Sequence, residues 1–334
     1  MKYLIIFLIL ILIPQIFYYF KKLHYKDLKN GSRFFIKEET NLKDRTKIVL
    51  TNADGFDIYV NRFDIKNPKG CVQIVHGMLE HSLNYLDFIS YLNRIGYAVI
   101  ISDNRGHGKS ISEKNPSGLI KFEDELIDDQ VVVSKYMKMV YPDKNLYMIG
   151  HSMGSLIARN FLKENDYLID KLILTGTVAY IPLASLGSFI GNIVCFYLGG
   201  KRRSRLLDLF SGISLKDMTW ISYNEENIRI KSKDFMRLSY FLARSNVCLF
   251  NLVSGLKKNF KAKNKDLDIL SLTGVDDDVT GGYKGLGKTM DILKSKGYEK
   301  LAFKEYDHMK HEILNEDEKE KVYEDIGRFL DKSN

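Results

Sequence analysis

The sequence predicts an α/β fold in which a mostly parallel sheet is covered by helices on both faces. From Lys47 onward, short apolar strands bounded by turn residues alternate with longer segments of helical composition, as in βαβ units. Residues 97–102 are almost continuously apolar, which is typical of a strand buried on both sides. The alternation stops near Tyr180 and resumes at Leu267, which indicates a helical cap inserted into one large domain.

These observations divide the chain of 334 residues into four parts. We expect a membrane anchor helix at 1–22, a first part of the core at 45–179, a helical cap at 180–265 and a second part of the core at 266–334. With 45% hydrophobic residues, a chain of this length can bury a large core.

The N-terminal segment predicts a single transmembrane helix. Residues 3–20 carry no charge, and as a helix these 18 residues would cover about 27 Å of a hydrocarbon core of roughly 30 Å. The run ends in aromatic residues and lysines, without the small-residue cleavage site of a secretory signal peptide. More lysines follow the run than precede it, which favours a cytoplasmic location for the rest of the chain. The lysines after it are Lys21, Lys22, Lys26 and Lys29, and Lys2 stands before it.

The core elements follow in order along the chain. A hairpin is expected around the turn at 52–55, because apolar segments flank it on both sides. Further strands are expected at 71–75, 97–102, 146–150, 171–174, 267–272 and 301–304. Helices are expected at 85–95, 122–140, 156–164 and 317–330.

The motif Gly150-His151-Ser152-Met153-Gly154 predicts a nucleophilic serine. It joins an apolar strand to a helix-forming segment, which is the context of the nucleophile elbow in G-x-S-x-G hydrolases. The sharp turn exposes the Ser152 hydroxyl and directs the backbone N–H of Met153 to the place where an oxyanion would form. The alternative is a glycine-rich turn whose serine only caps the helix.

A serine hydroxyl is a weak nucleophile, so Ser152 needs a base and an acid that orients the base. The candidate acids, aspartates 276–278, follow one predicted strand, and the candidate bases His308 and His311 follow the last one. Both sets lie where carboxyl ends of strands meet, in the chain order Ser, Asp, His. A metal site is less favoured, because three consecutive aspartates do not converge easily on one ion.

The second oxyanion donor is expected in the loop 75–82, which follows the strand at 71–75. Gly77 permits an unusual backbone turn there, and the backbone N–H of Met78 is the best candidate. His76 and His81 precede the serine in the chain, and we expect them to be structural.

The cap segment 183–198 is uncharged and mixes large apolar residues with Gly, Ser and Asn. It is too short and too polar for a second membrane span. We expect a helix whose apolar face lines an acyl pocket or dips into a bilayer, with the basic cluster 201–205 near anionic headgroups. A buried helix with a solvated basic end is the alternative.

Five motifs together resemble one branch of the α/β-hydrolase superfamily. They are HGMLEHS at 76–82, SDNRGHGKS at 102–110, GHSMG at 150–154, TGVDDDVTGGYKG at 273–285 and HEILNE at 311–316. The branch is that of monoacylglycerol lipases and lysophospholipases, often labelled serine aminopeptidase-like. The resemblance covers residues 47–330, and it includes a cap motif at 220–222.

The resemblance implies an α/β-hydrolase fold and selects the acid and the base. The family's acid stands three residues after the strand-ending glycine and two before a valine, which matches Asp277 between Gly274 and Val279. Asp278 occupies a position where the family commonly has proline. The family's base opens the last motif, which selects His311.

The resemblance further implies hydrolysis of carboxylic esters of lipids, monoacylglycerols or lysophospholipids, through an acyl-enzyme intermediate. No cofactor is needed for this chemistry. Aminopeptidase, thioesterase and acyltransferase activities on the same residues are alternatives, as is a catalytically silent membrane-bound binding protein. In the loop 102–110, Asp103 and His107 are expected to be structural.

Composition adds weaker expectations about partners. A net charge of +8 and a pI of about 9.0 are compatible with attraction to anionic surfaces or with a lysine-rich solvated surface. The three cysteines are far apart in the sequence and suggest neither disulfides nor a zinc site. No nucleic-acid-binding motif is recognisable, and the sequence gives no indication of the oligomeric state.

Overall fold

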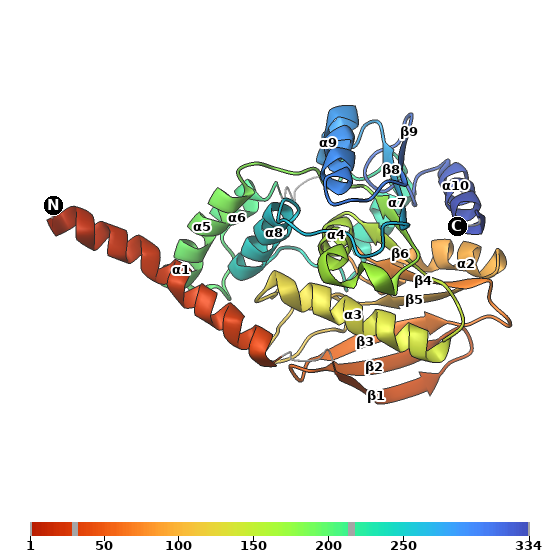
Figure 1. Ribbon diagram of the computed structural model, residues 1–334, viewed down its shortest axis with the longest axis horizontal. Coiled ribbons are helices and arrows are strands. Elements are labelled where there is room, and N and C mark those ends of the chain that lie inside the picture. The colour runs from red at the N-terminus through yellow and green to blue at the C-terminus, as the bar shows by residue number, and fades with distance from the viewer. Residues whose placement is uncertain (1, 29–32, 213–217, 333–334) are drawn as a thin grey trace.

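A computed structural model describes residues 2–28, 33–212 and 218–332. Lys29, one of the lysines counted beside the anchor, and residues 213–217 of the predicted cap lie outside these ranges. A nine-stranded sheet forms the centre of the molecule and helices cover both of its faces (Figure 1). The predicted α/β fold with a mostly parallel sheet is confirmed.

The sheet has the order β1-β2-β3-β5-β4-β6-β7-β8-β9. Strands β1, β2, β3 and β5 form antiparallel pairs, and all pairs from β5 through β9 are parallel. The strands are β1 Phe34–Asn41, β2 Thr46–Asn52, β3 Asp57–Phe63, β4 Gly70–Val75, β5 Tyr97–Ser102, β6 Leu146–His151, β7 Lys171–Thr175, β8 Asp268–Gly274 and β9 Leu301–Tyr306.

The register of the central strands aligns their carboxyl ends. Val75 of β4 lies opposite Gly150 of β6, and His151 of β6 lies opposite Thr175 of β7. Because parallel strands run in one direction, the residues that follow these strands gather at one edge of the sheet. The predicted site residues belong to loops and turns at that edge, or, for Met153, to the first position of a helix that begins there.

Two layers of helices sandwich the sheet (Figure 1). Alternate strand residues pack against α3 and α4 on one face and against α2 and α10 on the other, which gives two separate apolar clusters. These helices are α2 Leu86–Arg94, α3 Glu123–Val140, α4 Met153–Asn165 and α10 Lys319–Asp331. A further helix, α9 Gly282–Lys294, connects β8 to β9.

The described residues between β7 and β8 form four α-helices, within the range predicted for the cap. They are α5 Ala184–Val194, α6 Arg205–Phe210, α7 Glu225–Lys233 and α8 Ala243–Gly255, and a π-helical turn, Cys195–Gly199, extends α5. Cap helices α5 and α8 lie against each other. The borders of the four predicted parts of the chain stay a prediction.

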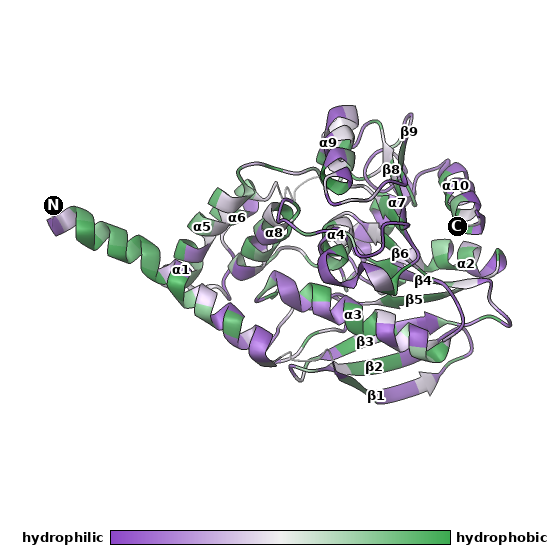
Figure 2. Ribbon diagram, viewed as in Figure 1, coloured by the Kyte–Doolittle hydropathy of each residue, from purple (hydrophilic) through white to green (hydrophobic). Residues whose placement is uncertain are grey.

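The N-terminal helix α1 spans Lys2–Leu28 and is longer than the predicted anchor at 1–22. It is the one helix, within the described ranges, that is long and apolar enough to cross a membrane. Its first half projects from the molecule and is strongly hydrophobic, whereas its end is polar (Figure 2).

The polar end of α1 is docked on the core, which explains why the helix continues past residue 22. The ring of Tyr25 is buried against Phe122, and its hydroxyl donates a hydrogen bond of 2.9 Å to Asp128. The Lys22 ammonium lies 2.9 Å from the Asp124 carboxylate. These contacts fix the last two turns of α1 on helix α3.

Candidate active site

Ser152 occupies a strained turn between β6 and α4. Its φ and ψ are 52° and −120°, a conformation that L-residues rarely adopt. A Cβ atom at Gly154 would lie only 2.0 Å from the Val75 carbonyl oxygen, so only glycine permits this approach of α4 to the end of β4. The sharp strand–turn–helix predicted from the G-x-S-x-G motif is therefore present.

The structure brings Ser152, His311 and Asp277 into one chain of hydrogen bonds. Ser152 Oγ lies 2.7 Å from His311 Nε2, and His311 Nδ1 lies 2.9 Å from Asp277 Oδ2. His311 and Asp277 are 3% and 2% exposed, so water competes little for these bonds. Asp277 is held further by the backbone N–H of Val279 and the Thr273 hydroxyl.

The neighbouring candidates point elsewhere. Asp276 is exposed and accepts a hydrogen bond of 3.0 Å from the Tyr223 hydroxyl. Asp278 is exposed at the start of a 3₁₀ turn. His308 is exposed, with its ring stacked on Tyr223 at 4.3 Å. None of the three is hydrogen-bonded to Ser152 or His311 among the contacts of the described residues.

The charges of Asp277 and His311 stabilise each other, which favours an ionised Asp277 and a more basic His311. Burial alone would lower the pKa of His311, but the charge and hydrogen bond of Asp277 outweigh it and hold that pKa above its ordinary value. Burial alone would raise the pKa of Asp277, but His311 outweighs it and the pKa lies below its ordinary value. A paired carboxylate thus stabilises the imidazolium that forms when His311 accepts a proton.

Three other buried histidines behave differently. Burial lowers the pKa of His76, of His107 to about 3 and of His151 to about 4, so all three are neutral at physiological pH. His76 Nε2 accepts the backbone N–H of Asn104 at 2.8 Å, and His107 Nε2 accepts that of Leu79 at 3.3 Å. These contacts agree with the structural roles expected for His76 and His107.

His81 likewise makes structural contacts. Its ring accepts the backbone N–H of Leu83 at the start of the 3₁₀ helix Ser82–Tyr85. Its other ring nitrogen lies 2.7 Å from the Asp234 carboxylate, at the end of cap helix α7.

The loop 76–82, which we call the oxyanion loop, lies directly beside Ser152. A Cβ atom at Gly77 would lie 3.0 Å from Ser152 Cβ. The N–H groups of Gly77 and Leu79 donate to Glu80 and His107, which fixes the loop on either side of Met78. Met153 is the first residue of α4, where backbone N–H groups have no partner within the helix. Both predicted donors thus belong to backbone adjoining the serine.

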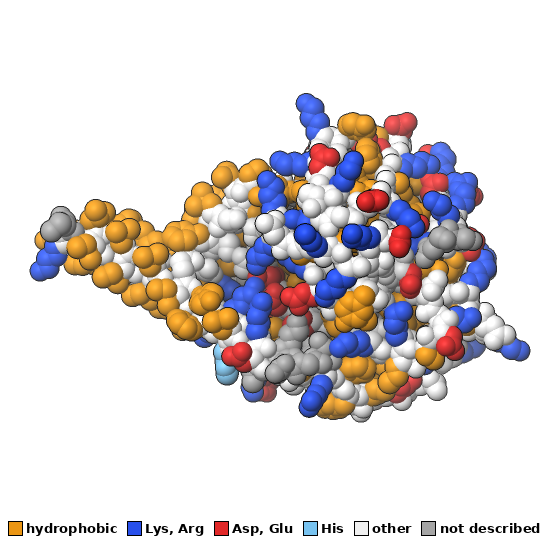
Figure 3. Space-filling model, in the orientation of Figure 1, with side chains coloured by type: hydrophobic (Ala, Val, Ile, Leu, Met, Phe, Trp, Pro, Cys, Tyr) orange, Lys and Arg blue, Asp and Glu red, His pale blue; other side chains and the backbone are white. Residues whose placement is uncertain are grey.

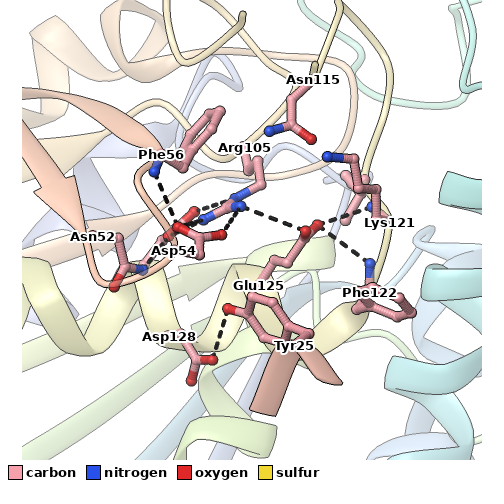
Figure 4. Close-up of polar contacts among 12 residues, drawn as sticks. Tyr25, Asn52, Asp54, Phe56, Arg105, Asn115, Lys121, Phe122, Glu125 and Asp128 are labelled. Carbon is pink, nitrogen blue, oxygen red and sulfur yellow. Dashed lines mark hydrogen bonds and ion pairs between the residues drawn. The ribbon is translucent and has the colours of Figure 1, made fainter. Parts of the chain in front are cut away.

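The loop after β5 is hydrogen-bonded to the oxyanion loop and holds it in place. Arg105 is buried between Asp54 of the β2–β3 turn and Glu125 of α3, as Figure 4 shows, and it also binds Asp129 at 2.8 Å. Asp103 accepts the backbone N–H of Ser82 at 2.8 Å. The loop therefore acts as a fixed support, and Asp103 has the structural contacts expected of it.

A cavity of about 450 Å³ opens beside Ser152, within the range usual for ligand pockets. The Trp220 ring lies 5.1 Å from the His311 ring at its rim. Most of the wall is apolar, and cap helices α5, α6 and α8 contribute Leu186, Ile190, Phe210, Leu249, Phe250 and Val253 to it. Cap residues 183–190 thus line a pocket, one of the two roles expected for this segment.

The other end of the cavity is polar and was not predicted from the sequence. Glu80, Lys231 and Glu312 line it, and the lysine lies 3.2 Å and 2.6 Å from the two carboxylates. Glu80 lies in the motif HGMLEHS and Glu312 in HEILNE, so their places in these motifs could have marked them as candidate site residues. Lys231 stands in a charged cap segment without any motif. In the part of the chain that the structure describes, no group of three His, Cys, Asp or Glu side chains is arranged to hold a metal ion.

The sheet order, the elbow and the serine–histidine–aspartate arrangement together define the chain as an α/β-hydrolase. Comparison with known proteins identifies the branch: residues 66–318 match the family described as serine aminopeptidase, S33, and the chain belongs to that family. The resemblance to monoacylglycerol lipases and lysophospholipases is confirmed.

The sequence identity to individual relatives is low. The chain is 32% identical to a monoglyceride lipase homolog of Monkeypox virus over 126 residues, which are 37% of this chain and 45% of the relative. It is 26% identical to phospholipase YtpA of Bacillus subtilis over 267 residues, 79% of this chain and 96% of the relative. The first curated relatives are matched over only 40% to 45% of their length.

Among solved structures, a thermostable carboxyl esterase from Bacillus coagulans in complex with glycerol superposes with a TM-score of 0.74 at 25% identity. The match covers 86% of this chain and 98% of the esterase.

Proposed function

We propose that the protein is a membrane-anchored serine hydrolase that cleaves carboxylic esters of lipids, either monoacylglycerols or lysophospholipids. The observation that carries this proposal is the 2.7 Å contact between Ser152 Oγ and His311 Nε2 at the wall of a largely apolar cavity. The relatives named monoglyceride lipase homolog and phospholipase support the same substrate classes.

In the proposed mechanism, His311 takes the proton of Ser152 as the serine oxygen attacks the ester carbonyl. The backbone N–H groups of Met78 and Met153 stabilise the resulting oxyanion. Asp277 orients the imidazole and stabilises its charged form. The alcohol leaves with the proton from His311, and water activated by His311 then releases the acyl group from Ser152.

The acyl chain is proposed to lie in the apolar part of the cavity, with the scissile carbonyl at Ser152. Leu183, Leu186 and Phe210 line the cavity and are accessible to solvent. We propose that a lipid enters the apolar part of the cavity past these residues.

The N-terminal helix and the cap are proposed to enter the membrane together. Helix α1 packs along α5: Gln15 donates to the Phe189 carbonyl and accepts from Asn192, each at 2.9 Å. The Tyr197 hydroxyl donates to the Leu10 carbonyl at 2.8 Å. Hydrophobic side chains gather along α1 and the adjoining cap (Figure 3).

These contacts limit how far the cap can stand from the bilayer. Residues 2–9 precede the first of these hydrogen bonds, and as a helix they cover about 12 Å of a hydrocarbon core of roughly 30 Å. If α1 enters the core fully, the exposed cap residues must enter with it; Leu198 and Leu209 are 67% and 75% exposed. We further propose that the hydrolase domain faces the cytoplasm, on the lysine distribution around α1.

A hydrolysis assay tests the proposal. The purified full chain in detergent is given monoacylglycerols, lysophospholipids, acyl thioesters and aminoacyl amides, with Ser152→Ala as the control. We expect release of fatty acid from one of the two lipid esters and none from the control. Turnover of only amides or thioesters, or equal turnover by Ser152→Ala, would show that the proposed reaction is wrong.

A further inference from the structure

The cluster of Glu80, Lys231 and Glu312 joins three separate parts of the molecule. Glu80 belongs to the oxyanion loop, Lys231 to cap helix α7, and Glu312 to the segment 308–316 after β9, which we call the base loop. Lys231 Nζ lies 3.2 Å from Glu80 Oε2 and 2.6 Å from Glu312 Oε1. Lys231 is 4% exposed, which is rare for a lysine and requires paired charges.

Each carboxylate lies next to a group that the proposed mechanism uses: Glu80 is hydrogen-bonded beside the oxyanion donor Met78, and Glu312 adjoins the base His311 in the chain. Glu80 accepts the backbone N–H of Gly77, the residue before Met78, and the Tyr85 hydroxyl at 2.6 Å. Glu312 directly follows His311 in the chain, and its second oxygen accepts from Asn227 of α7 at 2.9 Å. Movement of either carboxylate would therefore shift the oxyanion donor or the base.

The positive charge of Lys231 allows the carboxylates of Glu80 and Glu312 to be buried on either side of it in their charged forms. Burial alone would raise the pKa of Glu80 and of Glu312, but the Lys231 ammonium outweighs it and holds both below their ordinary values. The two carboxylates in turn raise the pKa of Lys231 against the effect of burial. Without the cation, the carboxylates would repel each other or share a proton.

We propose that Lys231 is a positioning residue, carried by the cap, that holds the oxyanion loop and the base loop in their reactive arrangement. The proposal rests on the proposed function of Ser152 and His311. It makes the cap part of the catalytic machinery as well as the wall of the acyl pocket, because helix α7 must lie on the core for both loops to be held.

Kinetics of three variants test this role. Lys231→Met removes the cation at similar length, Lys231→Arg retains it, and Lys233→Met is the matched control, since Lys233 is exposed on the same helix. We expect kcat on the preferred lipid ester to fall about 10- to 100-fold in Lys231→Met with little change in KM. Lys231→Arg should recover part of the loss, and Lys233→Met should match the parent. Parent-level kcat in Lys231→Met would overturn the proposal.

The pH dependence separates positioning from a general packing defect. In Lys231→Met a proton shared by Glu80 and Glu312 can replace the missing cation, so the ratio of variant to parent kcat should rise as pH is lowered from about 8.5 to about 6. The titratable groups that face the pair are Tyr85 and the histidines His76, His107, His151 and His311. Burial raises the pKa of Tyr85 and lowers the pKa of His76, His107 and His151. Glu80 and Glu312 also raise the pKa of His311, but once they share a proton the variant cluster has the net charge of the parent cluster, so the His311 titration cancels in the ratio at the lower pH. A ratio that is the same at both pH values would contradict the proposal.

A second variant keeps the test valid if Lys231→Met does not fold. Glu312→Gln leaves Lys231 paired with Glu80 but removes one carboxylate, so it should lower kcat several-fold and show no relief at low pH. Parent-level kcat in Glu312→Gln would then overturn the proposal.

Hydrogen exchange gives a readout that does not depend on activity. Amides of the oxyanion loop and the base loop should exchange faster in Lys231→Met than in the parent and in Lys233→Met. Unchanged exchange would overturn the positioning role. If the parent hydrolyses nothing while exchange responds as expected, the proposed function fails and the structural role of Lys231 stands.

Discussion

Among the buried histidines of the described residues, His311 combines a contact to a serine hydroxyl with a hydrogen bond to a buried carboxylate, whereas His81 contacts the carboxylate of the partly exposed Asp234. The direct hydrogen-bond partners of His76, His107 and His151 are neutral groups, and burial lowers the pKa of each although Glu80 lies near all three. Asp277 reverses that effect at His311. A histidine that is basic, oriented and next to a serine hydroxyl has what a general base requires.

The pH dependence of activity follows from this contact. His311 acts as a base only when neutral, and its pKa is raised, so activity should be lost as pH falls through a midpoint above the ordinary histidine value of about 6.5. The acid limb of kcat/KM against pH measures this midpoint. A midpoint at or below the ordinary value would contradict the assignment of Asp277 as the partner of a charged His311.

The choice among the three aspartates can be tested separately. Asp277→Asn should lower kcat by about 10³- to 10⁴-fold, because the amide no longer stabilises the imidazolium. Asp276→Asn and Asp278→Asn should remain within a few-fold of the parent, since both side chains are exposed. Loss of turnover confined to one of these two would reassign the acid.

At the scale of elements, the turn between β6 and α4 depends on glycine at a fixed place. Gly154→Ala would bring a Cβ atom to 2.0 Å from the Val75 carbonyl oxygen, so we expect destabilisation of about 2 kcal/mol or more and loss of turnover. Urea unfolding measures the first effect and the lipid ester assay the second.

Gly287→Ala is the matched control for this substitution. Gly287 lies in helix α9 with open space around its missing Cβ, so alanine should be neutral or stabilising by up to about 1 kcal/mol. Equal effects of the two substitutions would show that close approach is not what requires glycine at position 154.

Most core elements were predictable because their apolar residues recur with a regular period. Strand β1 was missed, since it is a polar edge strand whose side chains are mostly exposed. Helix α9 was missed because glycines at its start obscure the pattern, although Leu286, Thr289 and Leu293 form a buried face. Both elements lie outside the packed centre, where burial imposes little pattern on the sequence.

At the scale of the molecule, hydrophobic side chains gather along helix α1 and the adjoining cap (Figure 3). We predict that high-salt washing leaves the full chain in the membrane fraction, because burial of apolar surface does not weaken in salt. Release by salt would indicate a purely electrostatic surface association.

The cap should contribute to activity at membranes. Leu198→Glu with Leu209→Glu should lower turnover of lipid esters in vesicles several-fold and leave turnover of a short soluble ester unchanged, because the charges oppose insertion only. Tyr283→Glu, at an equally exposed position on α9 away from α1, is the control. Equal loss on both substrates would mean that the cap itself is damaged.

The site was predictable to the extent that it consists of local motifs in a fixed chain order. Ser152, Asp277 and His311 stand in such motifs, and the structure brings them together. Lys231 could not be predicted, because its role arises only where a cap helix meets two loops far from it in sequence. The docking of α1 likewise depends on contacts between distant segments.

The central claim is that Ser152 is an activated nucleophile, and covalent labelling tests it most directly. The full chain is incubated with a fluorophosphonate, and the modified residue is identified by mass spectrometry of its peptides, with Ser152→Ala and His311→Ala as controls. We predict a single adduct on Ser152 in the parent, none in Ser152→Ala and strongly slowed labelling in His311→Ala. A parent protein that remains unlabelled, or an adduct on another residue that persists in Ser152→Ala, would contradict the account.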